Sequence, residues 1–504
     1  MKVYVKGTGV NLSKRDFVAQ GGQGAVYVKG GRAFKIYHKP QDMIPQQKMG
    51  HLSAISHPSV IAPEEEVLSA KKKRIGYTMQ FVRDTYAMCQ LFPRVFKERH
   101  GLRPSTVLDL VLQLREALLS IHQCKVHVID FNELNILVAN DFSAPFIIDV
   151  DSFQTPGYPA TVIMPSVRDW HTPVKDYGEG SDWFSFAIVT FQLFIGIHPY
   201  KGRHPKVKGL EERMKANISV FDKDVRMPKA CYTLDTIPAA YKDWYQKVLV
   251  DGQRHEPPED ANVVAVSVPI IVVKHSDKLD IQYVREIAMD HDDIRQLKLG
   301  YVRNNVGVTF SEAVFHLDTV YLRSKDKILE VIELPGKKVG TKLVATVMEH
   351  ASRLYPGVAV QSMLGSIYVS VFPRSGACYQ VRIQELDGVK ISDAKFEGGV
   401  LMVVGAQNGK YDRHIFRFDE SYATYDHRTA KDIVPSGINF TVTDNGVCVV
   451  LTEEEKLEAF SAKKGAKTVK VIEDPVLGGD MELLSHQGGV GFVRNGKLYS
   501  MKMK

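Results

Sequence analysis

The pattern of apolar and polar positions divides the chain into two parts. Up to about residue 260, short apolar strands alternate with stretches of helical periodicity. From about residue 263, short apolar strands are broken by polar turns, with almost no helical periodicity. Alternation of period two indicates strands, and apolar residues three or four apart indicate helices. The pattern predicts an α+β domain over residues 1–262, with lobes of about 1–82 and 83–262, and an all-β domain over 263–504.

The first lobe is predicted to consist of strands with one short helix. Residues 17–37 read FVAQGGQGAVYVKGGRAFKIY, which predicts three strands separated by a glycine-rich turn and a tight Gly30-Gly31 turn. Residues 41–56 carry apolar residues at helical spacing, and the proline at position 58 ends that helix. Further strands are expected near residues 67–68 and over residues 75–82.

Two helices are predicted for the second lobe. One is expected to begin at Ser105 as its N-cap and to continue to about His122. The other, Ser181–Gly196, is apolar on nearly all sides, which is typical of a buried helix. Asp182 at its start is placed to cap it and to reach the backbone of a neighbouring loop.

Between these helices lies the stretch HVIDFNELNILV at residues 127–138, followed by IIDVD at 147–151. Two apolar strands flank polar tips, so we expect a hairpin that presents Asp130, Asn135 and Asp149 together. Two carboxylates and an amide at these separations can converge on one metal-nucleotide site. Taken one at a time, such residues more often cap turns in loops, and that alternative stays open.

The glycine-rich turn is a candidate phosphate site. Gly21, Gly22 and Gly24 would let backbone N–H groups approach phosphate oxygens without a Cβ in the way. Val26 would cover a base, and Lys35 lies in the middle of an apolar strand. The alternative is a glycine-rich hairpin whose edge lysine reaches solvent, because short glycine motifs give false matches.

Six strand-turn-strand segments recur in the second part, roughly 40 residues apart, which is the period of a four-stranded propeller blade. They are residues 270–284, 320–332, 367–383, 400–418, 447–460 and 490–501. We predict a β-propeller of about six blades, with five or seven allowed. A β-sandwich or an irregular β domain is the alternative.

Composition restricts the class of protein. The chain has 504 residues, 44% of them hydrophobic, and a formal net charge of +7, which suits an anionic ligand but does not require nucleic acid. Its five cysteines are scattered without a CxxC motif, which argues against a disulfide framework or a zinc site. No apolar run reaches the roughly 20 residues that a membrane span needs. We therefore expect a cytoplasmic protein with no membrane contact.

The order of motifs over residues 17 to about 260 resembles the eukaryotic-like protein kinases. The motifs are GGQGAVY at 21–27, AFK at 33–35, HxxDxxxxN at 127–135, IDVD at 148–151 and SDWFSFA at 181–187. The stretches IDVDSFQ at 148–154 and SDWFSFAIVTFQLFIGIHPY at 181–200 are similar to a bacterial and phage-associated branch. Members of that branch are often encoded beside PP2C-type phosphatases and von Willebrand A-domain proteins.

The resemblance implies a role for each matching residue. Lys35 would contact the α- and β-phosphates of ATP, Asp130 would be the catalytic base, and Asn135 and Asp149 would bind Mg²⁺. Asn132 stands where the kinases have a catalytic lysine. The remaining nucleotide-binding positions would be Gly21, Gly22, Gly24, Val26, Met79 as gatekeeper, and Gln80 to Val82 as the hinge.

The chain departs from the kinase pattern at several positions. Val128 replaces the arginine of the catalytic loop, so control through a phosphate on an activation loop is not expected. Asp151 replaces the hinge glycine of the metal-binding triplet. Lys48 falls where a helix glutamate should pair with Lys35, so another carboxylate must serve Lys35, from the run at 64–66 or Asp149 itself, or the nucleotide binds less tightly.

The first hypothesis is an ATP- and Mg²⁺-dependent Ser/Thr protein kinase whose β domain binds a protein substrate or assembly partner. The second is a pseudokinase scaffold that binds nucleotide without transfer. The third is a small-molecule phosphotransferase, which Asn132 favours. The sequence leaves the acceptor, the oligomeric state and the bacterial or phage origin open.

Overall fold

A computed structural model describes residues 1–160, 163–261, 276–286, 308–316, 319–335, 338–373, 376–463 and 468–504. It is a mixed α/β structure with a C-terminal all-β region. The chain forms two compact units. Residues 1–16, 20–92 and those from 102 to the end of the α+β region form the first, and residues 17–19, 93–101 and the C-terminal β region form the second. The predicted boundary between residues 262 and 263 lies outside the described residues.

The N-terminal strands form one sheet in the order β2-β1-β6-β7-β5-β4-β3. Their bounds are β1 Lys2–Val5, β2 Thr8–Asn11, β3 Phe17–Gln20, β4 Gly24–Lys29, β5 Arg32–Tyr37, β6 Glu66–Ser69 and β7 Arg74–Gln80. The predicted Gly30-Gly31 turn joins β4 to β5, and both glycines have positive φ. Tight hairpins favour glycine there for that reason.

Strand β5 separates a hydrophobic face from a polar one. Phe34 and Ile36 pack in a cluster with Val3 and Val67. Successive residues of a strand point to opposite faces. Lys35 and Tyr37 therefore lie together on the other face of the sheet, which is where the candidate site forms.

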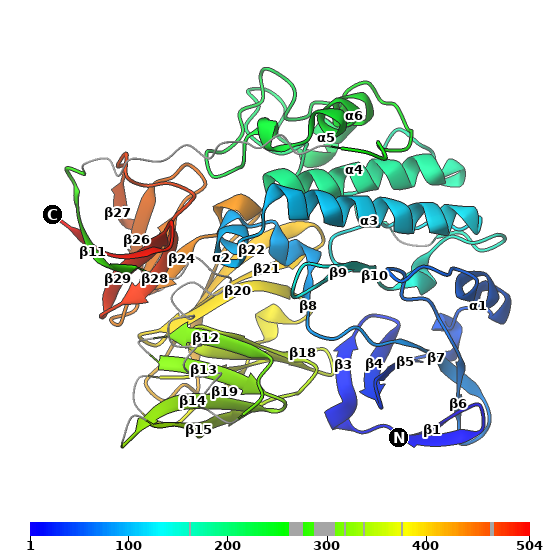
Figure 1. The fold of residues 1–504 in the computed structure, drawn as a ribbon, viewed down its shortest axis with the longest axis horizontal. Coiled ribbons are helices and arrows are strands. Elements are labelled where there is room, and N and C mark those ends of the chain that lie inside the picture. The colour runs from blue at the N-terminus through cyan, green and yellow to red at the C-terminus, as the bar shows by residue number, and fades with distance from the viewer. Residues whose placement is uncertain are drawn as a thin grey trace. The chain divides into compact units, whose positions relative to one another are not determined.

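The helices follow in the first unit. They are α1 Gln46–Ser53, α3 Pro104–Gln123, α4 Glu179–Ile195, α5 Leu210–Lys215 and α6 Ala239–Leu249. Helix α4 contacts both α3 and α6 and is buried at every position from Ser181 to Ile195 (Figure 1), as its all-round apolar sequence predicts. None of the helices within the described ranges combines the length and apolarity needed to cross a membrane.

The predicted N-cap of the long helix is wrong. Pro104 occupies the first helical position and Arg103 is the N-cap residue, so Ser105 lies inside the helix. Proline suits the first turn because its fixed φ is already helical and its missing N–H would have no partner there.

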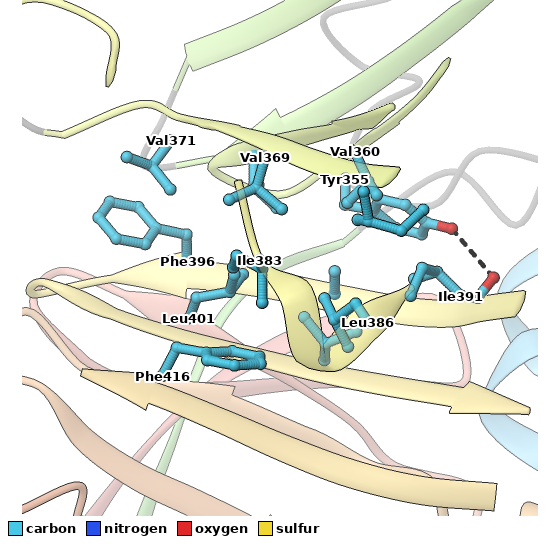
Figure 2. Packing of buried hydrophobic residues seen from close by; sticks show 14 of the residues in the cluster. Tyr355, Val360, Val369, Val371, Ile383, Leu386, Ile391, Phe396, Leu401 and Phe416 are labelled. Atoms are coloured by element: carbon cyan, nitrogen blue, oxygen red, sulfur yellow. Dashed lines mark hydrogen bonds between the residues drawn. The ribbon is translucent and has the colours of Figure 1, made fainter. Parts of the chain in front are cut away.

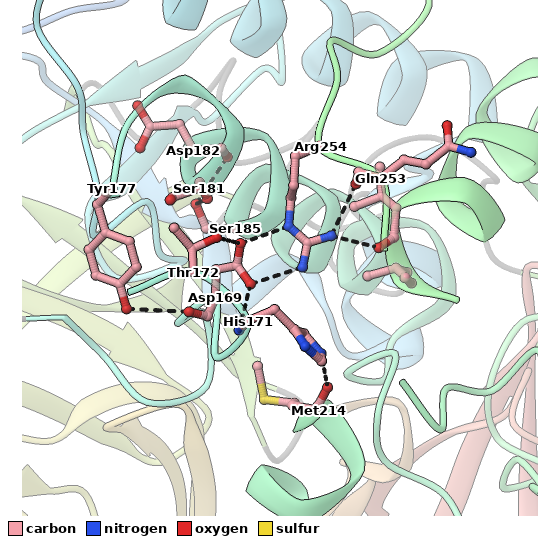
Figure 3. A network of polar contacts seen from close by, with 12 residues as sticks. Asp169, His171, Thr172, Tyr177, Ser181, Asp182, Ser185, Met214, Gln253 and Arg254 are labelled. Atoms are coloured by element: carbon pink, nitrogen blue, oxygen red, sulfur yellow. Dashed lines mark hydrogen bonds and ion pairs between the residues drawn. The ribbon is translucent and has the colours of Figure 1, made fainter. Parts of the chain in front are cut away.

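An ion pair connects the segment after the candidate loop to the end of this unit (Figure 3). Arg254 donates from Nε and Nη2 to the Asp169 carboxylate at 2.7 and 2.9 Å. The Asp169 carboxylate also accepts hydrogen bonds from Thr172 Oγ1 and the His171 N–H. Burial alone would raise the pKa of Asp169, but the bonds from Arg254 outweigh it and lower that pKa.

Five four-stranded antiparallel sheets make up the described β region: β12-β13-β14-β15, β16-β17-β18-β19, β20-β21-β22-β23, β24-β25-β26-β27 and β11-β30-β29-β28. The strands are β11 Leu279–Glu286, β12 Glu312–His316, β13 Thr319–Ser324, β14 Lys327–Leu334, β15 Lys338–Thr346, β16 Ser352–Tyr355, β17 Val358–Met363, β18 Ser366–Val371, β19 Tyr379–Arg382, β20 Lys390–Glu397, β21 Val400–Gln407, β22 Lys410–Phe418, β23 Tyr425–Ala430, β24 Phe440–Val442, β25 Val447–Leu451, β26 Leu457–Ser461, β27 Thr468–Ile472, β28 Glu482–His486, β29 Gly489–Arg494 and β30 Lys497–Met503.

The first of the six predicted hairpins, residues 270–284, is described only in its second strand. Its described strand β11 pairs with β30 at the C-terminus, and residues up to 275 lie outside the described ranges. The first and last predicted hairpins therefore contribute to one sheet. The pattern predicted two blades from strands of one sheet, because periodicity reveals strands but not the strands with which they pair.

Successive sheets meet through their first strands. Strand β12 contacts β16, β16 contacts β20, β20 contacts β24, and β24 contacts β28. Figure 2 shows the packing between the second and third sheets, where Val360 and Val369 face Phe396, Leu401 and Phe416.

Helix α2 (Arg94–His100) belongs to the second unit although it lies between β8 (Thr85–Ala87) and α3 in the sequence. Its Arg99 donates from Nε to Glu482 of β28 at 2.7 Å and from Nη2 to Asp393 of β20 at 3.4 Å. The helix also contacts the turn at Pro435–Gly437 that precedes β24. Residues 93–101 therefore cover the first strands of this β region.

Replacing Arg254 with Met tests the ion pair of Figure 3. The Asp169 side chain is fully buried, so losing Arg254 leaves a buried charge without its partner and should lower the free energy of unfolding by about 3 kcal/mol or more. Because the pKa of Asp169 is lowered, this contribution is present above about pH 4 and is lost as the pH falls below it.

All three tryptophans lie in the first unit, so urea unfolding followed by tryptophan fluorescence reports on that unit. Lys247→Met, which removes an exposed pair with Asp243, is the control and should change stability by less than about 0.5 kcal/mol. Equal stability of the Arg254 variant and this control would contradict the account.

Candidate functional site

The centre of the candidate site is a buried lysine held by two aspartates. Lys35 Nζ lies 2.8 Å from Asp149 Oδ1 and 2.6 Å from Asp151 Oδ1. Burial disfavours the charged ammonium, but Asp151 and Asp149 outweigh it and raise the pKa of Lys35. Lys35 is therefore a fixed positive charge at the polar face of the sheet.

The two aspartates differ in exposure. The Asp151 side chain is 1% exposed, whereas that of Asp149 is 47% exposed. Burial would raise the pKa of Asp151, but Lys35 and Tyr37 lower it. For Asp149 burial dominates and its pKa is raised. Asp151 is thus the internal partner of Lys35, and Asp149 keeps oxygen surface for a ligand.

Local backbone structure brings Asn135 beside Asp149. Strands β9 (Ile136–Ala139) and β10 (Pro145–Ile147) form a hairpin in which Ile136 pairs with Ile147. One residue beyond that pair, the Ile148 N–H donates to the Asn135 carbonyl at 2.9 Å. Asp149 follows in a left-handed conformation with φ 61°. The predicted hairpin therefore forms, with Asn135 and Asp149 at its polar end, and β8 (Thr85–Ala87) is its third strand.

Helix α4 holds the loop that carries Asp130 through the side chain of Asp182. Asp182 accepts hydrogen bonds from the N–H groups of Val128 and Ile129 at 2.9 and 2.6 Å, and lies 2.9 Å from His122 Nε2. Ile129 has φ 62°, a strained conformation for a β-branched residue. Asp182 stabilises that conformation rather than capping its own helix, whose N-cap residue is Gly178.

Asp130 is partly buried at the end of this loop. Its Oδ1 accepts a hydrogen bond from the Met164 N–H at 2.8 Å. Burial raises the pKa of Asp130, hydrogen bonds from Met164 and Asn132 oppose the increase, and the charge of Asp149 adds to it. Asp130 therefore lies near enough to Asp149 for the two carboxylates to repel each other.

Asn132 is used inside the loop. Its Oδ1 accepts from the N–H groups of Leu134 and Asn135, and its Nδ2 donates to the Asp130 carbonyl at 3.1 Å. The side chain is only 2% exposed. Asn132 thus positions the loop, and the catalytic role predicted for it stays a prediction.

The three glycines of the β3–β4 turn have different surroundings. A Cβ at Gly24 would lie 2.6 Å from the Ile36 carbonyl oxygen, so the fold itself requires glycine there. A Cβ at Gly21 or Gly22 would meet nothing within 4 Å, and neither residue has a positive φ. Nothing in the described protein therefore explains glycine at these two positions, whereas an anion bound against the backbone would.

Residues on three strands line the same face as Lys35. In register, Val26 of β4 and Tyr77 of β7 flank Lys35, and Met79 pairs with Ala33. Gln80 ends β7, and Val82 lies in the connection to β8. The predicted base-binding residues Val26 and Met79 thus share the face of Lys35, and Ala33 joins them.

Sequence reasoning missed the role of Asp151 and its tyrosines. Tyr37 Oη donates to Asp151 Oδ2 at 2.8 Å, and burial together with the charge of Asp151 raises the pKa of Tyr77. The spacing of Lys35 and Tyr37 on one strand face was a usable clue. The sequence predicts Asp151 only as a replacement for the hinge glycine. Its pairing with a residue 116 positions away cannot be read from a local pattern.

The described residues fit a magnesium nucleotide. No group of three or more His, Cys, Asp or Glu side chains that could hold a metal occurs among them, but Mg²⁺ is usually held by one or two carboxylates together with substrate phosphates and water. Asp149 and Asn135 supply such oxygens, and Lys35 and the backbone at Gly22 suit phosphates, while the Gly21 N–H donates to the Gly24 carbonyl at 2.9 Å.

Comparisons with known proteins add little to this geometry. No family model matches the chain, and no curated protein does. Among solved structures, the Cydia pomonella granulovirus kinase PK-1 matches with a TM-score of 0.35 and 14% identity, over 47% of this chain and 86% of that one. At these values we base no inference on the likeness.

Replacing Asp151 with Asn tests its assignment as the partner of Lys35. Because Asp149 still contacts Lys35, the free energy of unfolding should fall by about 2 kcal/mol, less than for a fully unpaired buried charge. The pKa of Asp151 is lowered, so the difference from wild type should be present above about pH 4 and shrink below it.

Tryptophan fluorescence during urea unfolding at pH 7 and near pH 3.5 measures this difference. Asp109→Asn, at an exposed position of α3, is the control and should match wild type at both values. A variant as stable as the control at pH 7 would rule out the assignment of Asp151.

Proposed function

We propose that the first unit is an ATP- and Mg²⁺-dependent phosphotransferase of the protein kinase class. The observation that carries the proposal is Lys35 held against Asp149 beside Asn135, with Asp130 electrostatically coupled to the same region. Lysine for phosphate, two metal-binding oxygens and a carboxylate for the acceptor are the parts that phosphoryl transfer requires.

Each part has a distinct task. Lys35 and the N–H group of Gly22 would hold phosphates, whereas the N–H of Gly21 donates to the Gly24 carbonyl within the turn. Asn135 and Asp149 would hold Mg²⁺, which when bound neutralises phosphate charge. Asp130 would accept the proton of the acceptor hydroxyl, with Met164 fixing one of its oxygens. Catalysis of this kind depends mainly on positioning and electrostatic stabilisation.

The finer assignments rest on the sequence motifs. A Ser/Thr acceptor on a protein substrate, and membership in the bacterial and phage-associated branch, are proposals from the resemblance at residues 127–154 and 181–200. A cytoplasmic location and the absence of nucleic-acid and membrane partners remain predictions from composition.

The second unit is proposed to be a β-propeller that binds a protein substrate or assembly partner. Successive four-stranded sheets that meet through their first strands support a propeller, and the pairing of β11 with β30 would close the ring. The described residues supply five such sheets where six blades were predicted. Because α2 covers β20 and β28 through Arg99, a partner would use another surface of this unit.

A nucleotide-binding scaffold without transfer activity is the alternative. Lys48 at the position of the helix glutamate and Asp151 in place of glycine favour it. The placement of Lys35, Asp130, Asn135 and Asp149 opposes it. The third hypothesis, a small-molecule phosphotransferase, is favoured only by Asn132. It loses that support if the Asn132 side chain serves to position the loop.

Asp130→Asn tests the reaction. Wild type should transfer label from γ-labelled ATP to a general protein substrate or to itself, and the variant should be slower by about 10²-fold or more. ATP binding should be retained, because Asp130 is not assigned to the nucleotide. Transfer by wild type should also decline as acid protonates Asp130, starting at higher pH than for an ordinary aspartate, since its pKa is raised.

The control for this assay is Asp109→Asn. Equal transfer by wild type and Asp130→Asn would contradict the kinase proposal. An ATP-induced thermal shift without transfer by wild type would support the scaffold.

Gly22→Ala and Gly24→Ala form a matched pair. A Cβ at Gly22 would meet no neighbouring atom, so the free energy of unfolding of the Gly22 variant should stay within about 0.5 kcal/mol of wild type. The variant should nevertheless bind ATP several-fold more weakly. The free energy of unfolding of the Gly24 variant should fall by about 1 to 3 kcal/mol, because the added methyl group clashes with the Ile36 carbonyl. Fluorescence unfolding and calorimetric ATP titration measure the two effects, and unchanged ATP affinity of Gly22→Ala would argue against a phosphate at the turn.

A further inference from the structure

Lys48 is a buried lysine that has no counter-ion among the described residues. It lies on α1 and is 7% exposed. Among the described residues, no hydrogen bond or ion pair to its ammonium is found within the distances that define one, and its electrostatic interaction is with Asp151. Burial lowers the pKa of Lys48, and Asp151 opposes the decrease without cancelling it.

Both oxygens of Asp151 already have partners on strand β5. Oδ1 binds Lys35 and Oδ2 binds Tyr37. Helix α1 nevertheless contacts the turn Val150–Ser152, which places Lys48 at the edge of the Lys35 site. A desolvated ammonium costs free energy unless something negative offsets it.

Asp149 and Asp151 thus both pair with Lys35. Lys35, Lys48, Asp149 and Asp151 form a group with two charges of each sign. A glutamate at position 48 would leave the group with a net negative charge instead. The substitution therefore makes the site more favourable for an anion.

We propose that Lys48 is a second phosphate-binding lysine, whose counter-ion is the polyphosphate of a nucleoside triphosphate. This inference rests on the proposed nucleotide site and deepens it. Lys35, anchored by Asp151, and Lys48, left unpaired, would act on the same polyphosphate, so helix α1 contributes to ligand binding directly rather than by holding Lys35.

Lys48→Met in the full chain tests the inference. Calorimetric titrations with ATP and with adenosine, each with Mg²⁺ and with EDTA, separate phosphate binding from base binding. ATP affinity should fall tenfold or more, and adenosine affinity should stay within twofold of wild type. The melting temperature without ligand should stay or rise, because Met removes a desolvated charge and keeps the length of the side chain.

The matched control is Lys73→Met, at an exposed lysine in the β6–β7 turn, and it should bind both ligands like wild type. Unchanged ATP affinity of Lys48→Met, or equal losses for ATP and adenosine, would overturn the inference while leaving the proposed function intact. A wild type that binds no ATP would overturn both.

A second measurement does not depend on the folding of a variant. Amine-specific acylation of wild type, followed by mass spectrometry, reports the reactivity of Lys48, which its lowered pKa favours. ATP should protect Lys48 several-fold and adenosine should not. Equal labelling of Lys48 with ATP and with adenosine would contradict the inference.

Discussion

The structure of the candidate site depends on one buried ion pair, between Lys35 and Asp151. Strand alternation places Lys35 on the polar face of β5, and an isolated ammonium there would be costly. Asp151 offsets that cost because its Oδ1 lies 2.6 Å from Lys35 Nζ, and Tyr37 donates a hydrogen bond to its other oxygen. Asp149, two residues earlier, is thereby brought against Lys35 while its side chain stays half-exposed. One contact thus orders both the lysine and the candidate metal ligand.

This pairing changes the role of helix α1. Where a helix glutamate holds the strand lysine, moving the helix releases the lysine. Here the carboxylate comes from the turn at Val150–Ser152, in the same segment as Asp149. Lysine and metal ligand are therefore coupled through neighbouring residues, and α1 is free to carry Lys48. The loop is held separately, by Asp182 on the buried helix α4. Both supports are contacts within the first unit.

Local pattern predicted the strands of residues 17–37, the buried helix α4 and the hairpin that joins Asn135 to Asp149, because each follows from periodicity over a few residues. It failed where partners are distant. Asp151 pairs across 116 residues, and β11 pairs with β30 at the other end of the β region. It also misplaced the start of α3, where Pro104 and Ser105 are both acceptable first-turn residues. The functional roles of the site residues remain predictions that the geometry supports.

The most direct test of the central claim is a crystal structure of the full chain with Mg²⁺ and a non-hydrolysable ATP analogue. The account predicts phosphates against Gly21, Gly22 and Lys35, a metal at Asn135 and Asp149, and Lys35 still paired with Asp151. A nucleotide bound elsewhere, or a metal that avoids Asp149, would contradict it.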